Sequence, residues 1–157
     1  MKKNIFIIVA LMCLFGFTCN DDNIIVIDMN DYLVKDTTNK FLVETSWKLL
    51  GFFDVEKNEL TEVGPNIDAY TLIFASEIQL HGRGLPNLLA GFYKCNYSLS
   101  SFDTIDFRSM TSAMPSEDEI LYVEAMNKIK LFLFTEDELK LFYNDKKNYL
   151  LFNRRTE

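Results

Sequence analysis

The sequence has few basic residues, few cysteines and one histidine, and each shortage excludes a class of function. Its 157 residues include 16 lysines and arginines against 23 acidic residues, which gives a net charge of −7 at pH 7. Proteins that bind a nucleic acid backbone concentrate positive charge, so we expect no nucleic acid partner. The single histidine, His81, and the lack of CxxC or HExxH spacing leave too few ligands for a zinc site. The length fits one domain.

The chain also lacks an apolar run long enough to cross a bilayer. Its N-terminal run, residues 5–17, has about 13 residues where roughly 20 are needed. Two lysines precede the run, which is typical of a secretion signal. The run ends in Gly16-Phe17-Thr18-Cys19, followed by Asn20-Asp21-Asp22. These residues resemble the lipobox of a bacterial lipoprotein, with an ordinary cleaved signal as the alternative.

The lipobox resemblance implies a signal peptide at residues 1–18 and acylation of Cys19. Acyl chains would attach the protein to a membrane almost permanently. Residues 19–40, which include Ile24-Ile25-Val26-Ile27, are interpreted as a tether that could dock on the domain. Asp21 and Asp22 resemble the surface-export signals of Bacteroidetes lipoproteins, which favours the outer membrane. A solvated tether carries two aspartates equally well, so the leaflet stays open.

Three cysteines, at positions 13, 19 and 95, predict no disulfide once the first leaves with the signal and the second carries lipid. Cys95 and His81 together would suit a cysteine hydrolase. The alternation of Tyr93-Lys94-Cys95-Asn96-Tyr97 instead predicts a strand that buries Cys95 as a small apolar residue. His81, next to Gly82 in a turn-like stretch, is predicted to be an exposed loop residue.

The body of the chain, residues 41–157, is predicted to be mainly β (α+β). Residues 47–49, 70–74, 92–99 and 105–107 alternate as half-buried strands, with Tyr70, Leu72 and Phe74 on one face. Three short apolar runs, at 130–134, 139–143 and 149–152, are separated by polar turns and predict an antiparallel meander. We therefore expect about seven or eight strands in a curled sheet or small open barrel, with one packed helix.

The helix is predicted from Ser116 to about Lys128. Ser116 and Glu119 have the spacing of a capping box, in which Ser116 accepts from the amide of Glu119 and the Glu119 carboxylate reaches back. An apolar stripe at helical spacing is expected to face the sheet; it comprises Leu121, Tyr122, Ala125, Met126 and Ile129.

The order of these landmarks resembles the META (HslJ-like) domain family, in its Bacteroidetes-type lipoprotein branch, over residues 41–153. The residues that carry the resemblance are Trp47, Tyr70–Phe74, Gly82, Asn87, Gly91, Tyr93, Thr111, Glu119–Tyr122 and the leucine-rich closing strands. The resemblance implies a small anchored envelope domain linked to stress tolerance or secreted virulence factors, and no catalytic residues. Gly82 and Gly91 are expected in turns, and Asn87 is expected to hydrogen-bond its loop.

The family resemblance also points to a departure. Many members carry one cysteine directly before the asparagine and another shortly after the threonine. Pro86 and about Pro115 stand at those places here, so the family's disulfide is missing and packing must replace it.

These observations predict a non-catalytic, lipid-anchored envelope protein that acts through protein contacts and needs no cofactor. The alternative is a lipocalin-like binder of a small ligand or carbohydrate, the latter through aromatics such as Phe52 and Phe53. Bulky inward residues such as Phe74, Tyr93, Leu133 and Leu141 favour a filled interior over a ligand cavity. Acid pairs such as Glu117 with Glu119 are interpreted as solvated charges rather than an acid–base pair.

Overall fold

The computed structural model describes residues 42–66 and 69–155, and it confirms a mainly β fold with one short α-helix. The predicted signal peptide, Cys19 and the tether lie outside the described residues. The elements, in chain order, are β1 (Thr45–Asp54), β2 (Glu59–Glu62), β3 (Thr71–Phe74), β4 (Gln79–Arg83), β5 (Leu88–Asn96), the 3₁₀-helix η1 (Tyr97–Leu99), β6 (Ser101–Ser109), α2 (Glu117–Met126), β7 (Leu131–Phe134), β8 (Glu138–Tyr143) and β9 (Asn148–Arg154).

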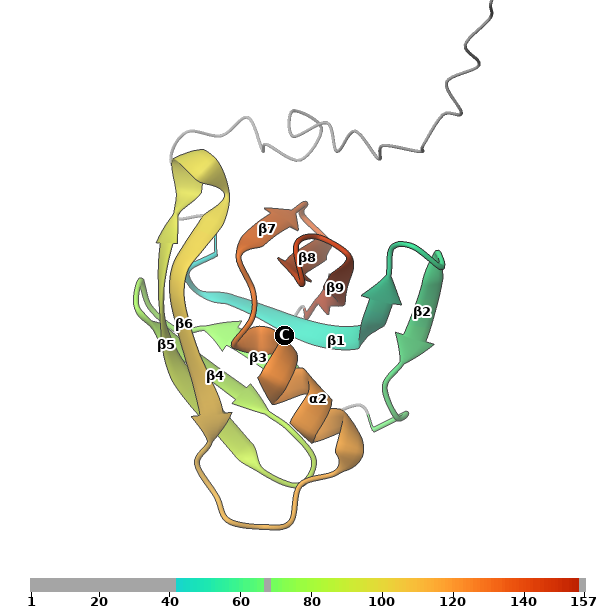
Figure 1. The fold of residues 1–157 in the computed structure, drawn as a ribbon. Helices are drawn as coiled ribbons and strands as arrows, with labels where there is room; N and C mark the ends of the chain where they lie inside the picture. Colours follow the sequence, from blue (N-terminus) through green and yellow to red (C-terminus); the bar gives the residue numbers. More distant parts are fainter. Residues whose placement is uncertain (1–41, 67–68, 156–157) are drawn as a thin grey trace, which may run out of the picture.

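The strands form one antiparallel sheet that curls into a nearly closed ring (Figure 1). The order is β2-β1-β3-β4-β5-β6-β7-β8-β9, and β1 also pairs with β9 over most of its length. Closure through β1 and β9 leaves fewer exposed strand edges than an open sheet would present. The strand pairing is shortest between β6 and β7, where it is limited to Ser101 opposite Leu131.

The sheet has nine strands rather than seven or eight because β2 and β4 are additional. β2 pairs with the second half of β1, at residues where no strand was predicted. β4 contains His81 and Gly82, which the sequence pattern assigned to a turn-like stretch. The three-stranded meander β7–β9 is confirmed, with register running from Leu131 opposite Phe142 to Tyr143 opposite Asn148.

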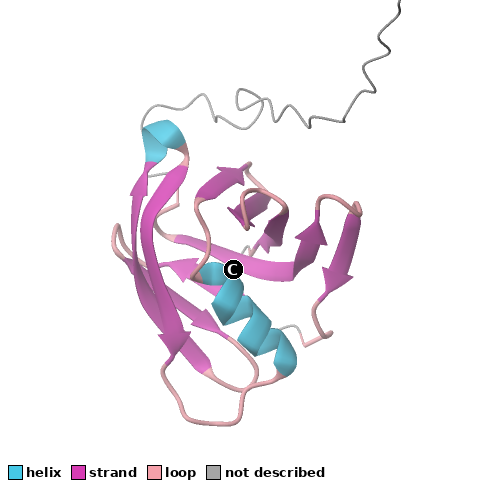
Figure 2. Ribbon diagram, viewed as in Figure 1, coloured by secondary structure: helices cyan, strands magenta, loops and turns pink. Residues whose placement is uncertain are grey.

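Helix α2 packs against β6 and β8, beside the short β6–β7 pairing (Figures 1 and 2). Asn127, at the C-terminal end of the helix, hydrogen-bonds the backbone of β6 through its side-chain amide, as the backbone of a neighbouring strand would. Its Oδ1 accepts from the Phe107 amide at 2.8 Å, and its Nδ2 donates to the Phe107 carbonyl at 2.7 Å. The free edge of β6 is therefore occupied at Phe107 by a side chain where a neighbouring strand is missing.

One member of the predicted helical stripe is wrong. Tyr122, Ala125, Met126 and Ile129 are buried as expected, but Leu121 is 52% exposed. Glu119, three residues before Tyr122 and on the same side of the helix, is buried instead, with 1% of its surface exposed. The buried face of α2 therefore includes Glu119, in its first turn, and excludes Leu121. Hydrophobicity alone would have placed the leucine in the core and the carboxylate in solvent.

Large side chains fill the interior of the ring, and Phe74, Tyr93 and Leu141 belong to the core as expected. Leu133 is buried, but it lies opposite Lys140 on the other face of β7, so the expectation that it points inward is wrong. Aromatic rings meet edge to face along it, as between Phe74 and Tyr93 at 5.2 Å and between Phe107 and Tyr122 at 5.7 Å. The largest fully buried residues are Trp47, Tyr70, Tyr122, Phe74, Phe107, Phe132 and Phe152. None of the helices among the described residues is long and apolar enough to span a bilayer.

Candidate functional site

Two of the predicted family positions, Trp47 and Tyr93, are core residues. Trp47 on β1 is fully buried, and its indole Nε1 donates to Thr45 Oγ1 at 2.7 Å. Tyr93 on β5 is buried, and its hydroxyl donates to the Ser76 carbonyl at 2.8 Å. Burial raises the pKa of Tyr93 to about 12. Both aromatic residues have polar atoms with partners, as buried indole and phenol groups require.

Gly82 and Gly91 lie in strands, and the expectation that they shape turns is wrong. Gly82 is in β4, where a Cβ would lie 2.5 Å from the Thr71 carbonyl oxygen and 2.9 Å from Phe107 Cζ. Gly91 is in β5, where a Cβ would overlap the Asp106 carbonyl oxygen of β6. Neither glycine has a positive φ. Each is needed because neighbouring backbone approaches too closely for a side chain.

The structure brings Asn87, Thr111 and Glu119 together with Ser109, and we call these four residues the Asn87 cluster. Glu119 Oε1 accepts from Asn87 Nδ2 at 2.8 Å and from Ser109 Oγ at 2.9 Å. Glu119 Oε2 accepts from the backbone N–H of Asn87 at 3.2 Å. Three donors thus surround one carboxylate, which is the condition under which a buried acidic side chain is tolerated.

Asn87 joins this carboxylate to the long loop between β6 and α2. Its Oδ1 accepts from Thr111 Oγ1 at 2.7 Å and from the Ala113 amide at 3.1 Å, while its Nδ2 also donates to the Ala113 carbonyl at 3.0 Å. The expectation that Asn87 would hydrogen-bond a loop holds, but the partner is a loop about 25 residues away in the sequence. In Figure 2 this loop and the β4–β5 loop meet at one end of the molecule.

Ser116 caps the helix, but only one half of the capping box forms. Ser116 Oγ accepts from the Glu119 amide at 3.2 Å, and the Tyr70 hydroxyl hydrogen-bonds the same oxygen at 3.0 Å. The Glu119 carboxylate does not return to the Ser116 amide, which instead donates to the Leu85 carbonyl at 3.0 Å. Because Glu119 is engaged by Asn87, the local motif is replaced by contacts between distant segments.

The contacts of the Asn87 cluster attach the N-terminal end of α2 to the β4–β5 loop. Gly84 packs directly against the Glu119 side chain, where a Cβ would lie 2.6 Å from Glu119 Cδ. The carboxylate, amide and hydroxyl groups of the cluster therefore fix the positions of the β4–β5 loop, the β6–α2 loop and the start of α2 relative to one another. No group of three or more histidine, cysteine, aspartate or glutamate side chains is placed to hold a metal ion in the part of the chain that the structure describes.

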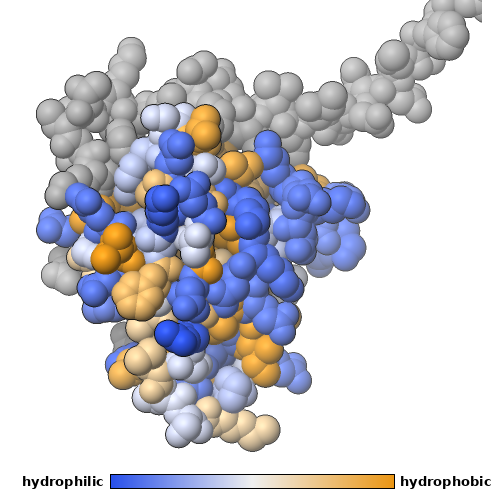
Figure 3. Space-filling view, turned by 60° about the vertical axis from the view of Figure 1, so that its left-hand side comes forward, coloured by the Kyte–Doolittle hydropathy of each residue, from blue (hydrophilic) through white to orange (hydrophobic). Residues whose placement is uncertain are grey.

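The outward side of β3–β6 is the region that the sequence reasoning missed. Cross-strand pairing sets its rows: Ile73, His81, Ala90 and Arg108 are neighbours in one row. On the same face, Gln79, Phe92 and Asp106 form the next row in one direction along the strands, and Arg83 and Leu88 form the next row in the opposite direction. We call this surface, with Met110 beyond Leu88, the outer face. In Figure 3, which brings this side of the molecule forward, apolar side chains lie among hydrophilic ones.

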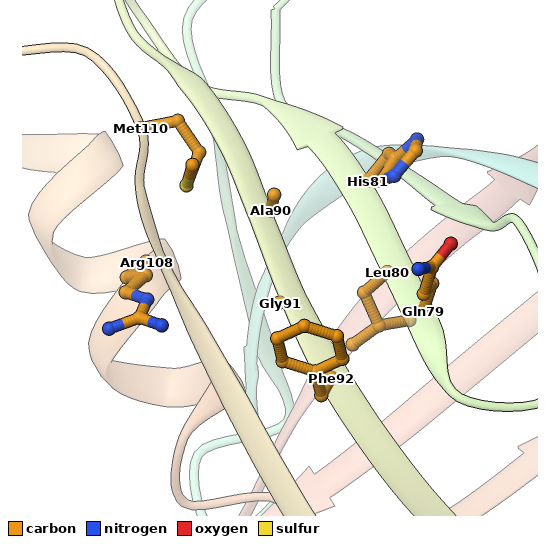
Figure 4. A pocket seen from close by; sticks show the side chains of 8 residues that line it. All are labelled: Gln79, Leu80, His81, Ala90, Gly91, Phe92, Arg108 and Met110. Atoms are coloured by element: carbon orange, nitrogen blue, oxygen red, sulfur yellow. The ribbon is translucent and has the colours of Figure 1, made fainter.

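The outer face exposes large apolar side chains around a shallow depression. Phe92 is 51% exposed and Met110 is 63% exposed. The depression has a volume of about 310 Å³, and its small residues are Ala90 and Gly91 on β5. Figure 4 shows Phe92, Met110 and Arg108 around these small residues, with His81 on the neighbouring strand. Such a surface can receive an apolar side chain and an accompanying negative charge.

His81 and Cys95 do not form a catalytic pair. His81 is exposed on the outer face, in strand β4 rather than in the predicted loop. Cys95 is half-buried and packs against the core, as the alternation predicted. Burial raises the pKa of the Cys95 thiol, which disfavours the thiolate that a nucleophile needs.

One sequence signal could have indicated the outer face. Residues 88–93, Leu-Leu-Ala-Gly-Phe-Tyr, are apolar at both odd and even positions. A strand that faces solvent on one side normally alternates apolar and polar residues. A continuous apolar run in such a strand therefore places apolar residues on the exposed side, as Leu88 and Phe92 are here.

Comparisons with known proteins agree with the fold and with one part of the sequence interpretation. No family model matches the chain. A protein of Tannerella forsythia named "Putative lipoprotein" is 25% identical over 111 residues, which cover 71% of this chain and 74% of that protein.

Two solved structures share the fold. A crystal structure of a DUF4847 family protein from Bacteroides vulgatus has a TM-score of 0.59 at 14% identity, covering 74% of this chain and 96% of the other. An NMR structure of a protein from Burkholderia xenovorans has a TM-score of 0.59 at 18% identity, covering 80% of this chain and 94% of the other. The chain is thus distantly similar to a protein named as a lipoprotein and shares the fold of a DUF4847 family protein and of the Burkholderia xenovorans protein.

Proposed function

We propose that this protein is a lipid-anchored envelope protein that acts by binding another protein through its outer face, without catalysing a reaction. The observation that carries this proposal is the half-exposed Phe92, with Leu88 and Met110 on the same outer face, on a sheet whose opposite side is packed. Exposed apolar groups that cluster on a folded domain mark interaction sites. The cationic side chains of Arg83 and Arg108 would select among partners by charge.

The anchor in this proposal is a lipid on Cys19. Its support is the residue pattern of the N-terminus, a basic start, an apolar run and a cysteine followed by Asn20-Asp21-Asp22, together with the name of the Tannerella forsythia relative. The proposal extends to the outer membrane, on the resemblance of Asp21 and Asp22 to surface-export signals. We expect Cys19→Ala to release the protein from the membrane fraction. Retention of this variant in the detergent phase would contradict acylation at Cys19.

The structure adds support for the META-like interpretation. In that family a disulfide would join the position before Asn87 to one near Pro115. Here the loops that contain these positions lie side by side, since the Ser116 amide donates to the Leu85 carbonyl at 3.0 Å and Ala113 exchanges two hydrogen bonds with the Asn87 side chain. Hydrogen bonds thus connect the two segments that a disulfide would connect in the family.

A second candidate is the binding of a small ligand or carbohydrate, and the depression favours it. Ligand sites have volumes of roughly 300 Å³ or more, and the depression reaches about 310 Å³. Its position differs from the barrel mouth expected of a lipocalin-like protein, because core side chains fill the interior. The exposed ring of Phe92 and the side chains of Gln79 and Arg108 would provide stacking and hydrogen bonds for a sugar.

The test is affinity capture from native envelopes with three baits: the wild-type protein, Phe92→Thr on the outer face, and Leu121→Gln as a control. Phe92 and Leu121 have almost equal exposure, 51% and 52%, but Leu121 lies on α2 away from the outer face. We expect a protein captured by the wild type and the control to be lost from Phe92→Thr. Equal capture by all three baits would contradict the proposed surface. Saturable binding of a soluble sugar that Phe92→Thr abolishes would favour the second candidate.

A further inference from the structure

The outer face combines apolar and cationic side chains in a chain that is acidic overall. Arg83 on β4 and Arg108 on β6 stand in neighbouring rows, with Leu88 and Ala90 of β5 between the two strands. Asp106 reaches Arg108 at 3.9 Å, with both side chains more than half exposed, so this ion pair is weak. The surface therefore fits an occupant that carries both apolar and acidic side chains.

The chain itself contains a segment with this composition. Ile24-Ile25-Val26-Ile27 is preceded by Asp21 and Asp22 and followed by Asp28 and Asp31. No lysine or arginine occurs between positions 20 and 34. β-Branched residues of this kind favour extended backbone, which fits a surface made of strands.

The place where the chain enters the domain lies close to the outer face. The Glu44 amide donates to the Phe74 carbonyl at 2.7 Å at the start of β1. Phe74 pairs with Leu80, and Leu80 pairs with Gly91, the neighbour of Phe92. With strands spaced about 4.8 Å apart, the entry point and Phe92 are separated by about three strand spacings, or roughly 14 Å across the sheet.

The intervening chain is long enough to make this contact. Fourteen residues, 28–41, separate Ile27 from Leu42. Fourteen residues reach about 45 Å when extended, and behave as a coil of roughly 20 Å when they are not. A linker of this length gives an effective concentration in the millimolar range, so an affinity too weak to matter between separate molecules is sufficient here.

We propose that the tether segment Ile24–Ile27, with its flanking aspartates, docks on the outer face around Phe92 and covers it until a partner displaces it. This inference rests on the proposed function because both use the same surface, and it adds the regulation of that surface. The isoleucines contact Phe92, Leu88 and Met110, and the aspartates lie near Arg83 and Arg108. A partner then competes with the protein's own tether, and its binding is linked to how the anchored chain is held at the membrane.

Methionine oxidation tests this docking within one molecule. Met110 belongs to the outer face, whereas Met114, 91% exposed, lies in the β6–α2 loop beyond it and serves as the internal control. The protein is the processed chain, residues 19–157, with Cys19→Ser so that it carries no lipid. It is compared with the same chain bearing Ile25→Ser and Ile27→Ser, and with a matched variant, Val34→Ser, outside the proposed segment. Peroxide oxidation at each methionine is followed by mass spectrometry.

If the segment is docked about three quarters of the time, Met110 oxidises about fourfold more slowly than in the double variant. The Met114 rate stays the same in all three proteins, and Val34→Ser behaves like the parent. An equal Met110 rate in the parent and the double variant overturns the docking. Envelope capture that still depends on Phe92 would in that case leave the proposed function intact.

A photo-crosslinking residue at position 92 supplies a second measurement that does not depend on the tether variants. Cross-linked peptides are expected to join position 92 to residues 20–31 within the same chain. Cross-links between two copies of the chain, or to α2 and the core only, overturn the proposal. The result is independent of the envelope capture, so the two proposals can fail separately.

Discussion

The Asn87 cluster and the outer face both include residues of the β4–β6 region, but they treat polar and apolar groups in opposite ways. In the cluster, two side chains that are 99% buried, Asn87 and Glu119, have their polar atoms paired with donors and acceptors from three segments. On the outer face, large apolar side chains are left half in water beside arginines. The first arrangement lowers the free energy of the folded chain, whereas the second leaves free energy available for binding a partner.

The largest expected effect comes from removing the centre of the cluster. Asn87→Ala removes the side-chain donor Nδ2 from the buried carboxylate of Glu119, while the backbone N–H of residue 87 remains, and it leaves Thr111 Oγ1 and the Ala113 N–H without their acceptor. Loss of one partner of a buried charged network costs about 3–5 kcal/mol, so we expect a fall of that size in the free energy of unfolding in urea. Asn153→Ala, on the exposed end of β9, is the control and is expected to change it by less than about 0.5 kcal/mol. A fall below about 1 kcal/mol for Asn87→Ala would show that the cluster does not stabilise the fold.

A disulfide across the two loops of the cluster should stabilise the protein by a comparable but smaller amount. Pro86→Cys with Pro115→Cys places thiols where the META resemblance implies them. The bridge would close a loop of about 30 residues, and we expect a gain of about 3 kcal/mol under oxidising conditions that disappears on reduction. Thiol titration and thermal unfolding measure both steps, with Pro115→Cys alone as the control. A double variant that keeps its thiols free would contradict the correspondence with the family's cysteines.

How far the sequence predicted these two regions depends on how local their determinants are. The start of α2 follows from Ser116 and three acidic residues, and the meander follows from apolar runs between polar turns; both are local patterns. The burial of Glu119 depends on Asn87, 32 residues away, so the helical period assigned that place to Leu121.

Gly82 and Gly91 illustrate the same limit. A glycine that permits close approach cannot be told from a turn glycine without the neighbouring strand, which here supplies the carbonyl oxygens of Thr71 and Asp106. The outer face was missed for a different reason: an apolar residue in a strand is assumed to face the core, and Phe92 does not. The sequence patterns were therefore sufficient for the helix and for the strands other than β2 and β4, but not for the contacts between these elements.

The loss of stability at alkaline pH is expected to depend on tyrosines of the interior and not on the outer face, and this effect is smaller than those of the cluster and disulfide variants. Burial raises the pKa of Tyr93 to about 12, and burial is also the main cause of the raised pKa of Tyr70, beside the helix cap. In the unfolded chain a tyrosine loses its proton near pH 10. Between about pH 10 and 12 the unfolded state therefore binds fewer protons than the folded state, so stability falls as pH rises.

The measurement is the urea midpoint between pH 9 and 12. Tyr93→Phe is expected to make the fall shallower, because one group that differs between the two states is gone. Phe92→Thr, its neighbour on the opposite side of β5, should leave the slope unchanged. An equally steep fall in Tyr93→Phe would assign the alkaline loss to other groups.

The smallest expected effect is the one that tests the comparison most directly. If the outer face stores free energy for binding, its residues should contribute little to folding. Phe92 keeps 51% of its surface exposed, so Phe92→Thr loses only part of the burial of a phenylalanine, and threonine retains a preference for strands. We expect the free energy of unfolding to fall by less than about 1 kcal/mol, against about 3–5 kcal/mol for Phe107→Ala on the packed side of the neighbouring strand. The ratio of these two values, measured in one urea series, decides the point, because a Phe92 variant as damaging as Phe107→Ala would mean that the outer face is part of the core.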